Sequence, residues 1–222
     1  MSIKFYSDPG SGSCRRVSAV IEHLQIEVEE VFVDLLAGGG QQAEFLAINP
    51  TGMVPVIVIE DPDQGVQILT EASAIMLYLC ESYGETALLP AFSKMQVLKW
   101  MFWAAEHFRQ APPIYFEENV VAPLMGNQAD NNRLAQAQHL LLRHGEILNN
   151  HLKDRTFVVG EQVTLADFDL AAALSQMSRS GIPFSQFEHI INWEKNLECS
   201  VSAWKLTGDR LQQRMNSALQ RV

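Results

Sequence analysis

Cysteines are few in this sequence, and their spacing excludes two classes of protein. Only Cys14, Cys80 and Cys199 are present among 222 residues, an odd number without a CxxC pair. Such spacing fits neither a disulfide framework nor a zinc site. We therefore expect reduced thiols and no bound metal.

Long hydrophobic runs are also missing. The chain is 47% hydrophobic, yet it has no run of about 18 consecutive apolar residues, the length that a membrane-spanning helix needs. The first residues lead directly to Asp8, without the apolar core of a secretory signal. The sequence therefore predicts a cytoplasmic protein that has no membrane partner and folds into two domains.

Basic residues are scarce, above all in the first part of the chain. The formal net charge is −10, and residues 1–84 hold three basic residues against twelve acidic ones. The remainder is nearly balanced, with thirteen basic and fourteen acidic residues. This excess of negative charge argues against nucleic acid as a partner. An anionic ligand of the first domain would depend on local features, such as helix N-termini and the side chains of Arg15 and Arg16.

Strand and helix patterns alternate through residues 1–84. In order, they predict a strand at 3–6, a helix capped by Ser11 or Ser13, a strand at 27–33, a short helix at 41–48, a hairpin of 56–60 with 66–69, and a helix from Ala72 to near Gly84. The first three elements indicate a parallel βαβ unit. The complete order is that of a thioredoxin-like domain.

After residue 84 the strand pattern disappears, so we expect a linker at 85–93 and an all-helical domain at 94–222. The first helix of that domain starts near Ser93, and the prolines at 112–113 should kink or interrupt it. A second helix is predicted at 131–152. Thr164 and Asp167 have the spacing of a capping box, which explains Asp167 without a catalytic role.

Three motifs resemble the glutathione transferase family and occur in the order expected for it. They are Asn49-Pro50-x-Gly52-x-Val54-Pro55, Glu71-Ala72-Ser73-Ala74-Ile75, and Val159-Gly160-Glu161-x-Val163-Thr164-Leu165-Ala166-Asp167. The resemblance covers essentially the whole chain. It implies an α/β thioredoxin-like N-terminal domain with an all-α C-terminal domain, and a homodimer. The implied activity is conjugation of glutathione, the co-substrate, to small hydrophobic electrophiles, or glutathione peroxidase activity, without a further cofactor.

The segment Pro9-Gly10-Ser11-x-x-Cys14-Arg15 resembles that of theta- and delta-type transferases, in which a serine hydrogen-bonds the glutathione sulfur. The resemblance assigns this role to Ser11. A hydroxyl at a helix N-terminus favours a thiolate through a hydrogen bond and the helix dipole. Three alternatives remain open: Cys14 as a reactive thiol, Tyr6 as in alpha-, mu- and pi-type enzymes, and Ser13 if the loop register differs.

The same resemblance implies the residues that bind glutathione. The backbone of Val54, which precedes Pro55, would pair with the cysteinyl part of the tripeptide. Glu71 would accept a hydrogen bond from the γ-glutamyl amine. The γ-glutamyl carboxylate would meet the backbone N–H at Ala72 and the hydroxyl of Ser73.

Three positions depart from the family pattern. Gly40 stands where theta- and delta-type relatives often have a histidine, Met53 where many have a lysine or a similar polar residue, and Ala72 where a serine is usual. The resemblance implies that the side chains at the first two positions usually contact the glycine carboxylate of glutathione. One lost charge-assisted hydrogen bond costs on the order of 1.5–3 kcal/mol. Weak glutathione binding, or a non-catalytic protein-interaction module with this fold, is therefore the alternative hypothesis.

Aromatic residues of the helical domain are candidates for binding the second substrate. They are Trp103, His107, Tyr115 and Phe116. Aromatic residues at helical spacing also fill protein cores, so this pattern alone predicts no electrophile.

Overall fold

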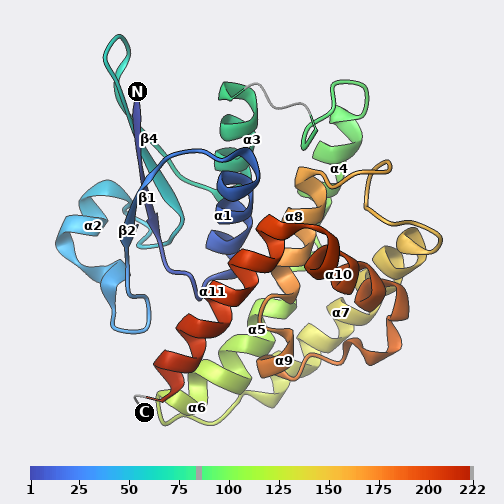
Figure 1. Ribbon diagram of the computed structural model, residues 1–222. Coiled ribbons are helices and arrows are strands. Elements are labelled where there is room, and N and C mark those ends of the chain that lie inside the picture. Colours follow the sequence, from blue (N-terminus) through green and yellow to red (C-terminus); the bar gives the residue numbers. More distant parts are fainter. Residues whose placement is uncertain (84–86, 221–222) are drawn as a thin grey trace. The chain divides into compact units, whose positions relative to one another are not determined.

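The structure, a computed structural model, describes residues 1–83 and 87–220, which form two compact units (Figure 1). Residues 1–83 and 203–220 belong to the first unit, and residues 87–202 belong to the second. The predicted helix end at Gly84 and the start of the predicted linker, residues 85 and 86, lie outside the described residues.

A four-stranded mixed sheet forms the centre of the first unit, with the strand order β2-β1-β3-β4. β1 (Ser2–Ser7) pairs in parallel with β2 (Glu29–Phe32) and antiparallel with β3 (Val56–Asp61), and β3 forms a hairpin with β4 (Gly65–Leu69). The first four residues of β3 are all buried, because this β-branched strand lies inside the sheet and is covered on both faces. The predicted parallel pair and the predicted hairpin are confirmed.

Helices cover the sheet of the first unit on both sides. α1 (Gly12–Leu24) and α3 (Ala72–Ser82) contact each other on one side, and α2 (Ala43–Ile48), preceded by the 3-10 turn η1 (Gly39–Gln41), lies on the other (Figure 1). Val17 and Val20 of α1 are fully buried, as the helical periodicity predicts.

The last helix, α11 (Ser202–Leu219), belongs to the first unit although the sequence places it with the helices of 94–222. Arg15 of α1 lies 3.7 Å from the centroid of the Trp204 ring and donates a hydrogen bond to the Trp204 carbonyl oxygen at 3.0 Å. The periodicity of a helix shows that one face will be buried. It does not show which surface covers that face.

The described residues of the second unit form helices and loops. α4 ends at Glu106, and α5 begins at Pro112, so the predicted interruption is confirmed. No helix among the residues described combines the length and the apolar character that a membrane crossing requires. The elements are α4 (Lys94–Glu106), η2 (Phe108–Gln110), α5 (Pro112–Phe116), the π-helix η3 (Glu117–Val121), α6 (Ala122–Leu124), α7 (Asn131–Leu152), α8 (Leu165–Ala171), η4 (Ala172–Leu174), α9 (Met177–Ser180), η5 (Phe184–Gln186) and α10 (Glu188–Ser200).

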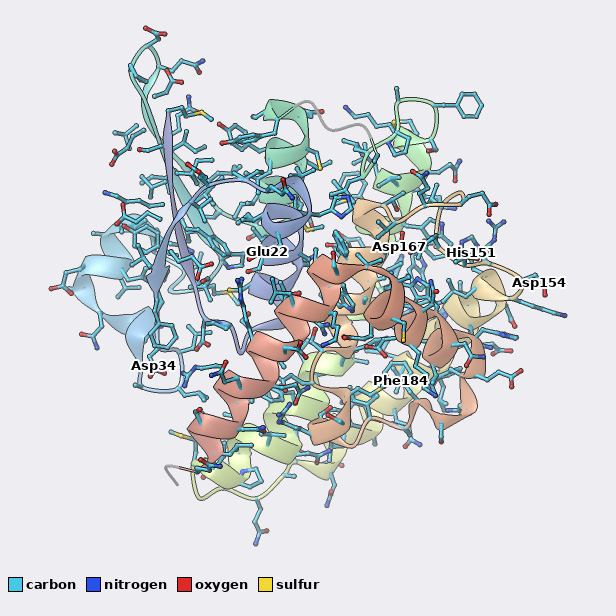
Figure 2. The ribbon with its side chains drawn as sticks, in the orientation of Figure 1. Glu22, Asp34, His151, Asp154, Asp167 and Phe184 are labelled. Carbon is cyan, nitrogen blue, oxygen red and sulfur yellow. The ribbon has the colours of Figure 1, made fainter. Side chains whose placement is uncertain are left out.

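Asp167 is fully buried at the start of α8 and organises the second unit locally (Figure 2). Its carboxylate accepts hydrogen bonds from the backbone N–H of Thr164 at 2.9 Å, that of Val158 at 2.8 Å and the indole N–H of Trp193 at 2.9 Å. Burial raises the pKa of Asp167 to about 6, and these hydrogen bonds oppose the rise. The predicted capping box is confirmed, and Asp167 also joins α8 to α10.

Candidate functional site

Ser11 is the N-cap of α1 and closes a tight turn after β1. Its backbone N–H donates to the carbonyl oxygen of Asp8 at 2.9 Å, and its Oγ accepts from the backbone N–H of Cys14 at 3.4 Å. The second bond satisfies a first-turn N–H that has no partner within the helix, so the helix begins at Gly12. Ser13 lies inside the first turn and is not the cap.

The carboxylate of Asp8 stabilises this turn through hydrogen bonds. It is 3% exposed, and its Oδ1 accepts from the backbone N–H of Gly10 at 2.9 Å. Its Oδ2 accepts from the backbone N–H of Leu35 at 3.2 Å, and Arg214 of α11 donates to both carboxylate oxygens. The sequence marks Asp8 only as a turn former, and no local pattern connects it with Arg214.

Val54 packs against the start of α1. Its side chain belongs to a buried cluster with Cys14 of α1 and Phe45 of α2, and the Val54-Pro55 bond that follows is cis. Within the described residues, nothing hydrogen-bonds to the backbone N–H or C=O of Val54. Both groups can therefore pair with an extended ligand, as the sequence predicts.

Asn49 shapes the loop that leads to Val54. It is 4% exposed, its amide donates to the carbonyl oxygen of Met53 at 2.7 Å, and its Oδ1 accepts from the backbone N–H of Thr51 at 3.2 Å. The Met53 side chain is 68% exposed. The asparagine of the Asn-Pro motif therefore has a structural role, and Met53 presents only a thioether to solvent.

Gly40 and Gly52 bring two loops of the first unit into close contact. A Cβ atom on Gly40 would lie 2.3 Å from the carbonyl oxygen of Gly52, and one on Gly52 would lie 2.7 Å from that of Gly40. Gly52 also has a φ of +68°, which favours glycine. A histidine at position 40 would force these backbones apart, so the departure from the family pattern has a steric cause.

Glu71 has an unusual backbone conformation immediately before α3. Its φ is 66° and its ψ is 108°, and its side chain is exposed. Such a conformation in a residue other than glycine costs on the order of 1–3 kcal/mol and is concentrated at functional sites. Ala72, the first residue of α3, is buried, and the Ser73 hydroxyl accepts a hydrogen bond from Nη1 of Arg16 at 3.2 Å.

Helix α1 brings three of the predicted segments together. Ser11 caps this helix, Cys14 on it shares a buried cluster with Val54, and Arg16 on it donates a hydrogen bond to Ser73 at the start of α3. The structure therefore places Ser11, the loop ending at Val54 and residues 71–73 around the N-terminal part of α1, all within the first unit.

Known proteins resemble this chain over most of its length. Residues 5–87 match the glutathione S-transferase N-terminal domain and residues 114–199 match the glutathione S-transferase C-terminal domain. Glutathione S-transferase 3 of Zea mays is 32% identical over 169 residues, which cover 74% of this chain and 73% of that protein. The chain belongs to the glutathione S-transferase family.

Two further relatives agree with this membership. Glutathione S-transferase 2 of Anopheles gambiae is 28% identical over 193 residues, covering 86% of this chain and 88% of that protein. The crystal structure of human glutathione transferase theta-2 has a TM-score of 0.82 and 27% identity, covering 97% of this chain and 91% of that one. The predicted glutathione transferase fold is confirmed. The family uses glutathione as co-substrate, and in the described part of this chain no three His, Cys, Asp or Glu side chains are grouped to hold a metal ion.

Of the alternatives for activating the thiol of glutathione, Cys14 lies in the core of this transferase and Tyr6 lies at its edge. Cys14 is fully buried, and burial raises the pKa of its thiol to about 12, although hydrogen bonds with the backbone of Asp8 and with Ser11 oppose this. Tyr6 is half-buried on the cluster around Val54, with its ring centroid 6.0 Å from that of Phe45. Cys14 is thus a poor nucleophile at neutral pH.

The aromatic candidates for the second substrate lie in the other unit of this transferase. The ring centroid of Trp103 lies 6.0 Å from that of His144 on α7, and His107 lies 5.3 Å from His144. Tyr115 is buried, and burial raises the pKa of its hydroxyl, whereas Phe116 is half-buried. Trp103 is half-buried and packs with the aromatic rings near α7, which agrees with a structural role, whereas His107 contacts His144 but is itself exposed.

We expect one of the three cysteines to react with a thiol reagent in the native protein. Cys14 and Cys80 are buried and Cys199 is exposed, and all three lie in the described residues without a disulfide. Thiol titration should give one reactive group before unfolding and three in denaturant. Cys199→Ser should abolish the native reaction, and native labelling of Cys14, located by peptide mass spectrometry, would contradict the burial argument.

Proposed function

We propose that this transferase conjugates glutathione to small hydrophobic electrophiles, with Ser11 stabilising the thiolate of bound glutathione. The observation that carries the proposal is the position of Ser11 as the N-cap of α1, beside the segment that contains Val54. A hydroxyl has one donor and two acceptor positions, so it can accept from the N–H of Cys14 and still donate to a sulfur atom. The positive end of the helix dipole favours the thiolate further.

The backbone of Val54 provides the second part of the proposed site. Its N–H and C=O would hydrogen-bond the cysteinyl residue of glutathione as an added strand does, which places the sulfur toward the start of α1. The human theta-2 structure, which resembles this chain, is a complex with glutathione, and this supports the proposal. The proposed glutathione-binding residues are Val54, Pro55, Glu71, Ala72 and Ser73.

The γ-glutamyl end of glutathione would lie at the start of α3. The exposed carboxylate of Glu71 can accept a hydrogen bond from the γ-glutamyl amine of glutathione. The first backbone N–H groups of α3 can donate to the γ-glutamyl carboxylate. Ala72 lacks the hydroxyl that the family usually has. Arg16 lies next to this helix start through Ser73 and adds positive charge there.

The proposed reaction needs no covalent intermediate on the protein. The thiolate of glutathione attacks the electrophilic carbon, forms the C–S bond and displaces the leaving group, a halide ion for an aryl halide. With an organic hydroperoxide the thiolate attacks the terminal peroxide oxygen, the O–O bond breaks and the alcohol leaves. The resulting glutathione sulfenic acid reacts with a second glutathione to give glutathione disulfide and water. The hydroxyl of Ser11 stabilises negative charge and does not act as a nucleophile.

We also propose a homodimer in the cytoplasm. Absence of disulfides among the three cysteines supports a reducing compartment. Exposed apolar side chains support an association surface: Val66 and Ile68 on the edge strand β4 are 67% and 49% exposed, and Met95 and Phe102 on α4 are 72% and 63% exposed. In a two-fold dimer, the first domain of one subunit would pack on the helical domain of its partner.

A non-catalytic interaction module is the second candidate function. It is favoured by the three positions that lack the family's usual side chains, Gly40, Met53 and Ala72. Each lost charge-assisted hydrogen bond would weaken glutathione binding by about 10-fold to 100-fold.

We expect conjugation of glutathione to a generic aryl halide, reduction of an organic hydroperoxide, or both, at millimolar glutathione. The rates should exceed those without protein, because the site stabilises the thiolate. Calorimetric titration with glutathione provides the matched binding measurement. Binding without turnover of either electrophile would reject the proposed catalysis, and absence of both binding and turnover would favour the interaction module.

Ser11→Ala should raise the pKa of bound glutathione and lower turnover at neutral pH by about 10²–10³-fold, because it removes a donor aimed at negative charge. The change in glutathione affinity should be modest. Ser13→Ala is the matched control, since Ser13 lies in the same turn of α1 but does not cap it. Wild-type turnover and an unshifted pH–rate profile in Ser11→Ala would leave Ser11 as a turn residue only.

Sedimentation equilibrium at micromolar protein should give twice the 24.9 kDa of one chain. Burial of the exposed apolar residues on β4 and α4 supplies the driving force. Ile68→Lys should shift the distribution toward the single chain, because a charge would be desolvated at the contact. A wild-type mass of one chain under these conditions argues against the dimer.

A further inference from the structure

The carboxylate of Asp8 is a buried junction of three segments of the first unit. It accepts from the backbone of its own turn at Gly10, from the backbone of the loop after β2 at Leu35, and from the guanidinium of Arg214 on α11. Three segments of the first unit therefore meet at one negative charge, three residues before Ser11. A buried carboxylate needs a cation or several donors to remain ionised.

Arg214 is positioned to hold both the turn and the neighbouring loop. Its Nε and Nη2 donate to the two carboxylate oxygens of Asp8 at 3.0 and 3.2 Å, and Nη2 also donates to Oδ1 of Asp34. The Arg214 side chain is 12% exposed. This forked geometry requires a planar guanidinium, because a lysine ammonium would be a single point charge.

Helix α11 also touches the turn directly. A Cβ atom on Gly10 would lie 3.0 Å from Sδ of Met215 and 3.3 Å from Cγ of Arg214. Ser11 follows Gly10, and its backbone N–H is held by the carbonyl oxygen of Asp8. A displacement of Asp8 would therefore move Ser11 in two ways. One is the covalent chain through residues 9 and 10, and the other is the hydrogen bond from the Ser11 N–H to the Asp8 carbonyl oxygen.

We propose that Arg214 is a positioning residue for catalysis, which fixes the Asp8–Ser11 turn from α11 and so sets the position of the Ser11 hydroxyl. This inference rests on the proposed role of Ser11. Without the guanidinium, the Asp8 carboxylate would keep its two backbone donors but lose its cation, and the turn would relax. A displacement of about 1 Å at a reacting group can cost on the order of 10²-fold in rate.

Arg210 offers a matched control on the same helix, one turn before Arg214. It is paired with Glu22 of α1 and lies 3.9 Å from Glu30, and its side chain is 41% exposed. In the part of the chain that the structure describes, no hydrogen bond or ion pair joins either partner to the turn at residues 8–11. Figure 2 labels Glu22 and Asp34, the carboxylates that accept from Arg210 and Arg214.

The test compares Arg214→Gln with Arg210→Gln in the full-length protein. The readouts are the pH dependence of kcat/KM for glutathione, the pKa of the bound thiol from its ultraviolet absorbance, and thermal unfolding. Arg214→Gln should raise the pKa of the bound thiol and lower kcat/KM about tenfold or more at neutral pH, with recovery at higher pH. Arg210→Gln should leave the pH profile unchanged. A lower unfolding temperature with an unshifted profile in Arg214→Gln would overturn the proposal.

Combination with Ser11→Ala separates this inference from the proposed function. In the Ser11→Ala background, Arg214→Gln should cause no further shift of the thiol pKa, because its effect acts through Ser11. An equal shift in both backgrounds would overturn the positioning role and leave Ser11 intact as the catalytic residue. An unshifted profile in Ser11→Ala alone would instead reject the role of Ser11 in the proposed function.

Arg214→Lys keeps the test decisive where Arg214→Gln does not fold. A lysine retains the positive charge beside Asp8 but cannot reproduce the fork, so the thiol pKa should rise by less than a complete loss of Ser11 causes. A folded Arg214→Lys protein with the wild-type thiol pKa and the wild-type ratio of kcat to KM would contradict the need for the forked contact.

Discussion

The buried carboxylate of Asp8 is the constraint on which the first unit depends. Removing a carboxylate from water is costly unless donors and a cation replace its hydration. Here the backbone of two loops supplies donors and Arg214 supplies the cation. Satisfying one charge therefore fixes the turn before α1, the loop after β2 and the position of α11 on this unit. A hydrophobic core would not define these loops so narrowly, because apolar contacts have little directionality.

The ion pairs of α11 also offset part of the negative charge of residues 1–84. Residues 1–84 contain three basic side chains against twelve acidic ones, which in isolation suggests a strongly negative domain. Two arginines of helix α11 form ion pairs with carboxylates of that domain. Arg214 pairs with Asp8 and Asp34, and Arg210 pairs with Glu22. Asp8 and Arg214 are 206 residues apart in the sequence. The C-terminal helix thus supplies cations that pair with carboxylates of the sheet domain. A domain boundary placed after residue 84, where the strand pattern ends, puts the two members of each ion pair in different domains.

Patterns that act over a few residues were predictable from the sequence, whereas those that depend on tertiary contact were not. The hairpin, the helix at 131–152 and the capping box at Thr164 and Asp167 follow from local periodicity or capping chemistry. The parallel strand pair is the exception, because the order strand, helix, strand predicts it. Both Ser11 and Ser13 had the chemistry of a cap, and only the turn bonded to Asp8 distinguishes them. Position 40 has glycine where relatives often have a histidine. Its steric reason is the carbonyl group of Gly52, on a loop that no pattern near residue 40 indicates.

Two of the three departures from the family pattern, Gly40 and Met53, fall at one end of the proposed glutathione site, whereas the third, Ala72, lies at the γ-glutamyl end. Gly40 and Met53 are at the positions expected to contact the glycine carboxylate, and here one has no room for a side chain and the other exposes a thioether. Ser11 and the backbone of Val54, proposed to hold the sulfur and the cysteinyl residue, depend on the tightly bonded turn at Asp8 and the loop fixed by Asn49. Binding energy at the glycine end would stabilise the ground state and the transition state alike, whereas contacts at the sulfur change with the thiolate charge. In a chain with this distribution of contacts, weaker contacts at the glycine end would lower the affinity for glutathione. The contacts at the sulfur would still control the pKa of its thiol.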